Sequence, residues 1–427
     1  MITTRFVYTL LLYLMLPGVL WHLWRRSRKQ PAYLEDIAER FGYYRQQPAH
    51  PLIWVHAVSV GETRAAAPLI EALRQRHPDH RILLTHMTPT GSETGEKLYG
   101  DGVLQCYLPY DYPGAVARFL DHFRPRLGLL METEIWPNLI HGCRQRRIPL
   151  YLVNARLSQK SLLKYRRFAG LTRASLDGLT AIAAQSSADA ARFAELGATR
   201  VIVTGNLKFD IEVPAGQQAL GWLWRKNYYG ESRPVLLAAS TRDGEEELLL
   251  DVLGQIAVPA LLLVIVPRHP QRFDEVAALL TRRRIRFQRR SGNAAIVPET
   301  RVVLGDSMGE MFAYYAACDI AVIGGSLLPF GGQNLIEACA AGKPVLVGPH
   351  TYNFAEAVEL AVAAGAAVQV ADAQGLAREA QRLLCDRDAA ARMAQAALAF
   401  SKAHRGATRR TLELLGRERG EWVVESG

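Results

Sequence analysis

The stretch that decides the fold runs from Cys318 to Phe354, CDIAVIGGSLLPFGGQNLIEACAAGKPVLVGPHTYNF. IAVIGG is a short apolar run rich in β-branched residues, which is typical of a buried strand, and a glycine-rich loop follows it. Asn334 is placed to cap a helix behind that loop, and a second apolar run, PVLVG, comes next. Strand, glycine loop, helix and strand in this order form half of a nucleotide-binding domain, in which the helix N-terminus suits an anion.

Glu337 lies three residues after Asn334, on the first turn of the expected helix. A carboxylate there could accept hydrogen bonds from the two hydroxyls of a ribose. The alternative is a capping pair in which the Glu337 side chain folds back onto the backbone, since N-x-x-E is a common helix start. The density of glycines before Asn334 favours nucleotide binding.

The alternation of apolar runs with helical patterns extends through the body of the 427-residue chain. Continuous apolar strands predict sheets buried on both faces, so the expected fold class is doubly wound parallel α/β. The strands are too many for one small sheet, and residues 211–233, with Pro214, Gly216, Gly221 and Gly230, interrupt the rhythm. We therefore expect two Rossmann-like domains facing a cleft, over residues 31–212 and 213–405, and a helical tail over residues 406–427 that packs back on the first domain.

The first 30 residues differ from the rest. Residues 6–24, FVYTLLLYLMLPGVLWHLW, contain no charged side chain, and as a helix they would reach roughly 28 Å, close to the hydrocarbon thickness of a bilayer. Four basic residues follow, which places the body on the cytoplasmic side by the positive-inside rule: Arg25, Arg26, Arg28 and Lys29. No signal-peptide cleavage site follows, so we expect a membrane anchor over residues 1–30, although Pro17 and Gly18 leave open a broken, interfacial helix.

Composition narrows the classes of function. The five cysteines form no CxxC pair, which disfavours a disulfide framework and a zinc ribbon and indicates a reducing compartment. The net charge of +10 suits membrane lipids and phosphorylated substrates, whereas the absence of nucleic-acid motifs argues against nucleic acid as a partner. The one D-x-D, at residues 386–388, falls in a helical stretch and is read as surface charge, so we expect no metal site.

Ligands of such sheets bind at the carboxyl ends of the strands, so the polar residues that follow each apolar run are the candidates. Glu62 is either a general base or a carboxylate that complements a helix dipole. Glu132 and Glu134 close an apolar strand, where burial requires partners or a substrate hydroxyl nearby. Lys208 and Arg268 suit a carboxylate or a phosphate, and His269 either contacts a ligand or is structural. Further strand-end residues include Asn154, Arg156, Met308, Gly309 and Glu310.

Seven motifs, taken together and in order, resemble one family. They are HAVSVGE (56–62), METEIWPNLI (131–140), NARLS (154–158), GNLKFD (205–210), PRHPQRF (267–273), GDSMGEM (305–311) and GGQNLIEA followed by PVLVGPHTYNF (331–354). The chain closely resembles the 3-deoxy-D-manno-octulosonic acid (Kdo) transferases of lipopolysaccharide synthesis, from the N-terminal anchor to about residue 405. Many members have GGHN where this chain has Gly331-Gly332-Gln333-Asn334, so a histidine role in that loop does not transfer.

The resemblance implies a GT-B fold at the bacterial inner membrane, with the N-terminal domain binding the acceptor and the C-terminal domain binding the donor, CMP-Kdo. The implied acceptor is a tetra-acylated, bisphosphorylated lipid A precursor, and the anomeric centre is inverted. Glu62 is implied as the proton acceptor, with Glu132 and Lys208 stabilising the transition state. We expect no cofactor and no metal, because the D-x-D lies outside the expected cleft and basic residues with a helix N-terminus can stabilise a monophosphate leaving group. The implied CMP site comprises Arg268, His269, Met308, Gly309, Glu310, Asn334, Leu335, Ile336 and Glu337.

Two other functions remain open from the sequence. A different membrane-associated GT-B enzyme that uses a nucleoside-diphosphate sugar would share the fold. A non-enzymatic, membrane-anchored binding module would keep the nucleotide loop without needing Glu62.

Overall fold

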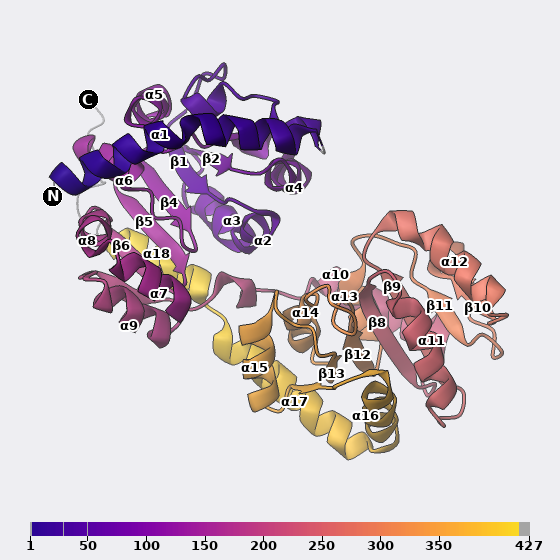
Figure 1. Ribbon diagram of the computed structural model, residues 1–427. Helices are drawn as coiled ribbons and strands as arrows, with labels where there is room; N and C mark the ends of the chain where they lie inside the picture. Colours follow the sequence, from indigo (N-terminus) through magenta and orange to yellow (C-terminus); the bar gives the residue numbers. More distant parts are fainter. Residues whose placement is uncertain (1, 29, 49, 418–427) are drawn as a thin grey trace. The chain divides into compact units, whose positions relative to one another are not determined.

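The computed structural model describes residues 2–28, 30–48 and 50–417. The ends of the expected anchor and tail at residues 1, 29 and 418–427 lie outside the described residues. The chain forms two compact units, drawn in Figure 1: one comprises the chain up to Asp210 together with the chain from Arg405, and the other is Ile211–His404. Each unit is built on its own sheet.

The first unit contains a seven-stranded, wholly parallel sheet in the order β3-β2-β1-β4-β5-β6-β7. Its strands are β1 Leu52–His56, β2 Arg81–His86, β3 Leu104–Tyr107, β4 Leu127–Met131, β5 Leu150–Ala155, β6 Ala181–Ala184 and β7 Val201–Val203. In register, Ile53 of β1 lies opposite Ile82 of β2 and Leu127 of β4. The strand order reverses between β1 and β4, and such a switch point is where open α/β sheets bind ligands.

Helices cover both faces of this sheet. They are α2 Val60–Ala65, α3 Ala67–Arg76, α4 Pro89–Tyr99, α5 Pro113–Phe123, α6 Pro137–Gln145, α7 Gln159–Arg166, α8 Ala169–Leu176, α9 Ser187–Glu195 and α18 Ala407–Arg417. Because successive strand residues point to opposite faces, Trp54 packs with Phe119 on one side, while Ile53 packs with Leu69 and Leu414 on the other. Burial on both faces explains why the strands read as continuous apolar runs.

The second unit repeats this plan with the order β10-β11-β9-β8-β12-β13-β14, again wholly parallel. Its strands are β8 Val235–Thr241, β9 Leu262–Pro267, β10 Phe287–Arg289, β11 Val302–Leu304, β12 Ile320–Ile323, β13 Val345–Val347 and β14 Ala367–Gln369. Its helices are α10 Ala215–Trp224, α11 Glu245–Gln255, α12 Phe273–Arg282, α13 Met311–Ala317, α14 Leu335–Ala340, α15 Ala355–Ala363, α16 Ala373–Cys385 and α17 Arg387–His404. The switch point lies between β8 and β12. The predicted doubly wound α/β class with two parallel sheets is confirmed.

The chain passes from one unit to the other twice, and Asp210 marks both passages. Its carboxylate accepts hydrogen bonds from the backbone N–H groups of Gly406 (2.6 Å), Ala407 (3.2 Å) and Thr408, and so caps the start of α18. Residues 211–233, which interrupt the sequence rhythm, form α10 and a π-helical turn over Arg225–Tyr229 within the second unit.

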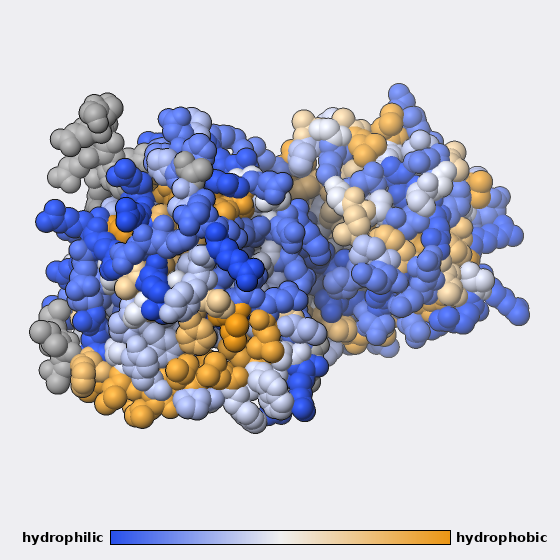
Figure 2. Space-filling model, turned by 90° about the horizontal axis from the view of Figure 1, so that it is seen from above, coloured by the Kyte–Doolittle hydropathy of each residue, from blue (hydrophilic) through white to orange (hydrophobic). Residues whose placement is uncertain are grey.

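Helix α1, Ile2–Ser27, is continuous through Pro17 and lies against the first unit (Figure 1). The Tyr8 hydroxyl donates to Asp111 Oδ2 (3.0 Å), and the Tyr112 hydroxyl donates to the Leu12 carbonyl (3.1 Å). The helix is long and apolar enough to cross a membrane by length and composition. Its exposed apolar side chains contribute to the hydrophobic band on the first unit in Figure 2: Phe6, Val7, Leu10, Leu11, Leu14 and Met15.

Candidate functional site

Glu62 stands at the switch point of the first sheet, in the first turn of α2 after β1. Its Oε2 accepts from the backbone N–H of Val58 (2.8 Å) and its Oε1 from the Ser59 hydroxyl (3.0 Å), while Ser59 caps the helix. Burial raises the pKa of the Glu62 carboxyl to about 7; the charges of Glu132 and Glu134 add to the rise, and both hydrogen bonds oppose it. A carboxylate that is fixed in place and titrates near neutral pH is suited to accept a proton.

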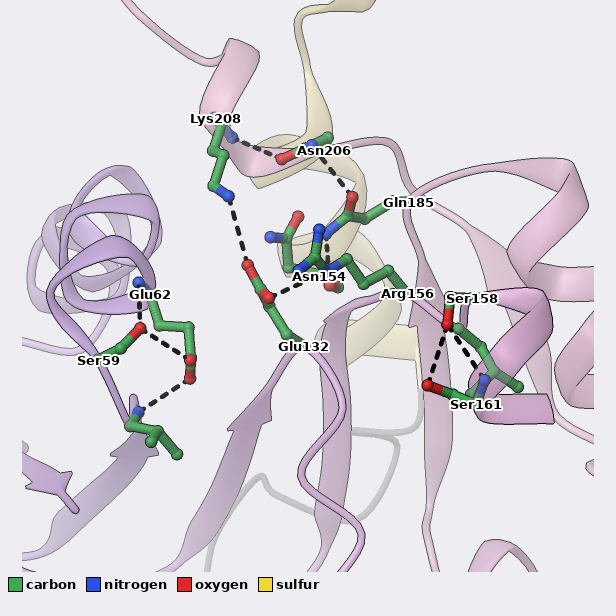
Figure 3. A network of polar contacts seen from close by, with 12 residues as sticks. Ser59, Glu62, Glu132, Asn154, Arg156, Ser158, Ser161, Gln185, Asn206 and Lys208 are labelled. Atoms are coloured by element: carbon green, nitrogen blue, oxygen red, sulfur yellow. Dashed lines mark hydrogen bonds and ion pairs between the residues drawn. The ribbon is translucent and has the colours of Figure 1, made fainter. Parts of the chain in front are cut away.

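Glu132 follows β4, the strand beside β1 at the switch point. Its backbone has φ of 58°, in the left-handed region that non-glycine residues rarely adopt, and such strain clusters at functional sites. Its buried carboxylate pairs with Lys208 Nζ (3.4 Å) and Arg156 Nε (3.2 Å). In Figure 3 the side chains of Glu62 on α2, Glu132 after β4 and Lys208 on the 3-10 turn Leu207–Phe209 extend toward the same region. The expectation that Glu132 needs partners is confirmed.

A chain of amide side chains holds the loop that carries Lys208 (Figure 3). Asn206 donates from Nδ2 to Gln185 Oε1 (3.1 Å) and accepts from the Lys208 backbone N–H (3.0 Å). Gln185 donates to the Asn154 carbonyl (2.8 Å), and Asn154 Oδ1 accepts from the Leu207 N–H (2.9 Å). This network holds the backbone N–H groups of Leu207 and Lys208 and so positions the loop that carries the Lys208 side chain.

Glu134 also has the partner that its burial requires. Its Oε2 accepts from Trp136 Nε1 at 2.6 Å. Burial raises the pKa of the Glu134 carboxyl, and the Glu132 charge adds to the effect. Glu134 therefore adds to the negative charge that keeps the Glu62 pKa high.

In the second unit, a buried carboxylate shapes the glycine loop after β12. Glu245 is fully buried; its Oε2 accepts from the N–H groups of Arg242 (2.9 Å) and Gly325 (2.5 Å), and its Oε1 accepts from that of Leu327 (3.0 Å). A Cβ on Gly324 would lie 2.4 Å from the Ser240 carbonyl oxygen, so the loop leaves the strand along a path that excludes larger residues.

Helix α14 begins behind that loop with Asn334 as its cap. Asn334 Oδ1 accepts from the Ile336 N–H (3.0 Å), and Asn334 Nδ2 donates to Glu337 Oε1 (3.2 Å). The Glu337 carboxylate is thus oriented by a side-chain amide in the first turn, beside Leu335 and the buried Ile336.

Arg268 and His269 leave the same sheet edge at the end of β9, next to β8. The Arg268 N–H donates to the Thr241 carbonyl (3.0 Å), which joins the two strand ends. Burial lowers the pKa of exposed His269, and the charges of Arg242, Arg268 and Arg272 add to that shift. His269 therefore sits among arginines that favour its neutral form, and a neutral imidazole ring can still donate or accept a hydrogen bond.

The turn Met308–Gly309–Glu310 follows β11 and leads into α13. Gln217 of α10 donates to the Gly309 carbonyl and accepts from the Phe312 N–H (3.1 Å), which fixes the turn. Gly309 has φ of 79° and open space around it, and the Met308 side chain is exposed. Glu310 Oε1 pairs with Arg290 Nη2 (3.3 Å), whose guanidinium also lies 4.1 Å from the Trp224 ring.

The structure therefore brings the sequence-predicted residues to two places. Glu62, Glu132 and Lys208 meet at the switch-point edge of the first sheet, and the residues of the expected nucleotide site leave one edge of the second sheet on the loops after β9, β11 and β12. No group of His, Cys, Asp or Glu with the geometry of a metal site occurs among residues 2–28, 30–48 and 50–417.

Three residues with clear roles here were not assigned them from the sequence. Glu245 begins an acidic EEE run that is typical of a solvated helix start, and Arg290 is one of the many arginines that give the chain its positive net charge. Arg156 was noted only as a strand-end residue, since its pairing with Glu132 joins segments far apart in the chain. The sole sequence signal for Glu245 is its position just after an apolar strand.

A cavity of about 1,510 Å³ lies at the opposite edge of the first sheet, where β1, β4 and β5 begin. Arginines such as Arg126 and Arg147 line it. Parallel sheets bind their ligands at the carboxyl ends of the strands, so the edge that carries Glu62 is the stronger candidate despite the size of this cavity.

Known proteins resemble the chain over nearly its whole length. Residues 35–211 match the family described as 3-deoxy-D-manno-octulosonic-acid transferase (kdotransferase), and residues 247–400 match the glycosyl transferases group 1. A 3-deoxy-D-manno-octulosonic acid transferase of Bordetella pertussis is 45% identical over 96% of this chain and 98% of its own length. The corresponding Haemophilus influenzae protein is 39% identical over 96% and 98%. A glycosyltransferase structure from Rickettsia africae covers 88% of this chain and 100% of its own, with a TM-score of 0.56 and 14% identity, and so shares the fold.

Proposed function

Because the chain belongs to the 3-deoxy-D-manno-octulosonic acid (Kdo) transferase family, and is thus a glycosyltransferase of lipopolysaccharide synthesis, we propose that it moves Kdo from CMP-Kdo to a lipid A precursor with inversion of the anomeric centre. The observation that carries the mechanism is the Glu62 carboxylate, which is half-buried, held by two hydrogen bonds and has a pKa of about 7. Single displacement requires one base and no covalent intermediate.

In this mechanism a hydroxyl of the acceptor attacks the anomeric carbon of Kdo while its proton passes to Glu62. The new carbon–oxygen bond forms as the bond to the CMP phosphate oxygen breaks, and CMP leaves with the electron pair. Glu62 must be ionised to begin, and its pKa near 7 leaves about half of the molecules in that state at neutral pH. Val58 and Ser59 hold the carboxylate in place, so little conformational entropy is lost when the reactive geometry is reached.

Glu132 and Lys208 stabilise the charges that develop in the transition state and take no part in the proton transfer. The sugar develops positive charge as the leaving group departs, which a fixed carboxylate stabilises, whereas the donor carboxylate and the leaving phosphate are stabilised by cations. Arg156 shares the Glu132 carboxylate with Lys208 and keeps this group of charges in place. The three side chains form a preorganised set that needs little rearrangement.

The CMP part of the donor is assigned to the second unit. The glycine loop and α14 offer backbone N–H groups, Glu337 accepts hydrogen bonds from ribose hydroxyls, and Arg268 with His269 contacts the phosphate. Met308, Gly309 and Glu310 complete the site beside the cytosine, where Gly309 leaves open space. No metal is required in this scheme, because fixed cations and N–H groups take the charge of the monophosphate.

The acceptor is embedded in a bilayer, and α1 supplies the attachment to it. We assign the body to the cytoplasmic side of the bacterial inner membrane and place α1 in the plane of the interface. The hydrogen bonds from Tyr8 to Asp111 and from Tyr112 to the Leu12 carbonyl hold this helix against the folded body. A helix that crossed the bilayer away from the body could not form them. Release of the protein by high pH without detergent would support the interfacial placement, and retention would support a spanning helix.

The direct test incubates the purified full chain with CMP-Kdo and a tetra-acylated, bisphosphorylated acceptor and identifies the product by mass spectrometry. The expected result is a mass increase of one or more Kdo residues that persists after exhaustive EDTA treatment. Competition by CMP but not UDP distinguishes this donor from a nucleoside-diphosphate sugar. Loss of activity on chelation with recovery on adding magnesium would overturn the metal-free mechanism, and transfer only from a UDP-sugar would overturn the donor.

A further inference from the structure

A cavity of about 650 Å³ lies between α1 and the body of the first unit, within the size range of roughly 300–1,000 Å³ that small-molecule sites occupy. One face of α1 forms a wall, from Leu14 through Gly18 to Arg26. These residues span about 18 Å of helix, at 1.5 Å per residue. No side chain comes within 4 Å of a Cβ placed on Gly18, so this glycine keeps the middle of the cavity open.

The two ends of this cavity differ in chemistry. The end near Leu14 and Met15 is apolar, and both side chains are also exposed on the outer surface of α1, so the cavity opens beside the hydrophobic band of Figure 2. The other end carries His22, Arg26 and Arg40, and no Asp or Glu of the described chain lines the cavity. An apolar channel with a basic end matches an amphiphile that carries an anionic group.

Arg40 gives the strongest evidence that the basic end of the cavity binds an anion. It is 1% exposed, donates from Nη1 to the Met87 carbonyl (3.2 Å) and lies 4.1 Å from the Tyr107 ring. It also lies 5.9 Å from the Tyr110 ring, and its Nε and Nη2 have no hydrogen-bond partner among the described residues. The neighbouring Glu39 carboxylate interacts with the Arg40 charge, which lowers the Glu39 pKa against the effect of burial, and accepts from the Tyr107 N–H. A buried guanidinium with unused N–H groups is costly unless a bound anion compensates it.

The cavity shares part of its wall with the Glu62 site. Val58 and Thr88 line it, and the Thr88 hydroxyl donates to the Val58 carbonyl (3.0 Å). The Val58 N–H in turn donates to Glu62 Oε2 (2.8 Å). A ligand in the cavity therefore lies one residue away from the group assigned as the base.

We propose that this cavity binds the acceptor glycolipid, with one acyl chain along the Leu14–Gly18 face of α1 and one phosphate at the end formed by Arg26 and Arg40. This rests on the proposed function, because the acceptor is taken to be a phosphorylated, acylated sugar. The acceptor differs from a bulk phospholipid because it carries a sugar, which would lie beside Val58 and extend toward Glu62. Arg40 and Gly18 are positioning residues for the acceptor and take no part in the chemistry.

The test measures direct binding of the acceptor to the full chain in detergent, without donor, so that it does not depend on transfer. Arg40→Gln removes the charge at the basic end, and Gly18→Leu fills the middle of the cavity. We expect each to weaken binding about tenfold or more, while CMP binding and the melting temperature stay near wild type. Arg45→Gln, an exposed arginine of the same segment, and Gly254→Leu, a helical glycine with open space around it, are the matched controls.

Two acceptors, each lacking one of the two phosphates, identify the group that Arg40 contacts. The effect of Arg40→Gln should vanish for one of them and persist for the other. Equal loss on all acceptors, or wild-type binding in both variants, would overturn the proposal; should Arg40→Gln fail to fold, Gly18→Leu alone decides it. Displacement of the acceptor by phosphatidylglycerol vesicles at equal lipid concentration would show a general lipid site and would also overturn it. If acceptor binding depends on Arg40 and Gly18 but no Kdo is transferred, the proposed function is rejected while the proposal that this cavity binds the glycolipid stands.

Discussion

Glu62 and Glu245 occupy matching places in the two sheets, yet their surroundings differ. Each lies in the first helical turn after the strand that begins the switch point, β1 in one unit and β8 in the other, and each accepts a backbone N–H from the preceding loop. Glu245 is fully buried and uses both oxygens on three N–H groups, whereas Glu62 is half-buried and bonds one N–H and one hydroxyl.

This difference separates a structural carboxylate from a reactive one. Three backbone N–H groups donate to Glu245, and its full burial keeps the carboxylate out of reach of a substrate. Burial near two other acids raises the pKa of Glu62 to about 7, which makes it a base of useful strength. In the proposed mechanism the same fold thus carries the chemistry at one sheet and the nucleotide-binding loop at the other.

The largest expected effect is that of Glu62→Gln on turnover. The amide cannot accept the proton but keeps the size of the side chain, so we expect the rate of Kdo transfer to fall by about 10² to 10⁴-fold. CMP binding and the melting temperature should stay near wild type, as they should in the control Glu71→Gln, an exposed acid of α3. Turnover close to wild type would move the role to Glu132 or Glu134.

Glu245→Gln should lower protein stability and CMP affinity, the two properties that Glu62→Gln leaves near wild type. The amide presents N–H to backbone N–H and leaves buried donors unpaired, which costs roughly 2–4 kcal/mol of unfolding free energy or of loop order. We expect weaker CMP binding, measured by calorimetry, and a lower melting temperature, with Glu247→Gln of the same helix turn as the exposed control. A variant with normal stability and normal CMP affinity but no turnover would break the distinction between the two acids.

Glu337→Ala probes the second unit more mildly. Loss of hydrogen bonds to ribose hydroxyls should weaken CMP binding by roughly 1–3 kcal/mol while the cap from Asn334 to the Ile336 N–H remains. Glu359→Ala, an exposed acid on α15, is the control. Unchanged CMP affinity in a folded Glu337→Ala protein would return Glu337 to a capping role in the first turn of α14, where Asn334 donates to it.

The sequence predicted the fold class because parallel strands buried on both faces read as apolar runs, as Leu127–Met131 does. It also predicted that Glu132 needs a partner, because an acid beside a buried strand requires one. The partner itself could not be predicted, since Arg156 and Lys208 reach Glu132 only through the sheet topology. Glu245 shows the same limit, because its burial depends on a glycine loop about 80 residues further along the chain.

The most direct test of the account is the pH dependence of kcat/KM for Kdo transfer by the wild type and by Glu62→Gln. A base acts only when deprotonated, so the wild-type rate should rise with pH through an apparent pKa of about 7, the value that burial gives Glu62. In Glu62→Gln the residual rate should lose this ascending limb. An ascending limb that persists near pH 7 in Glu62→Gln would show that another group accepts the proton and would contradict the assignment of Glu62 as the base.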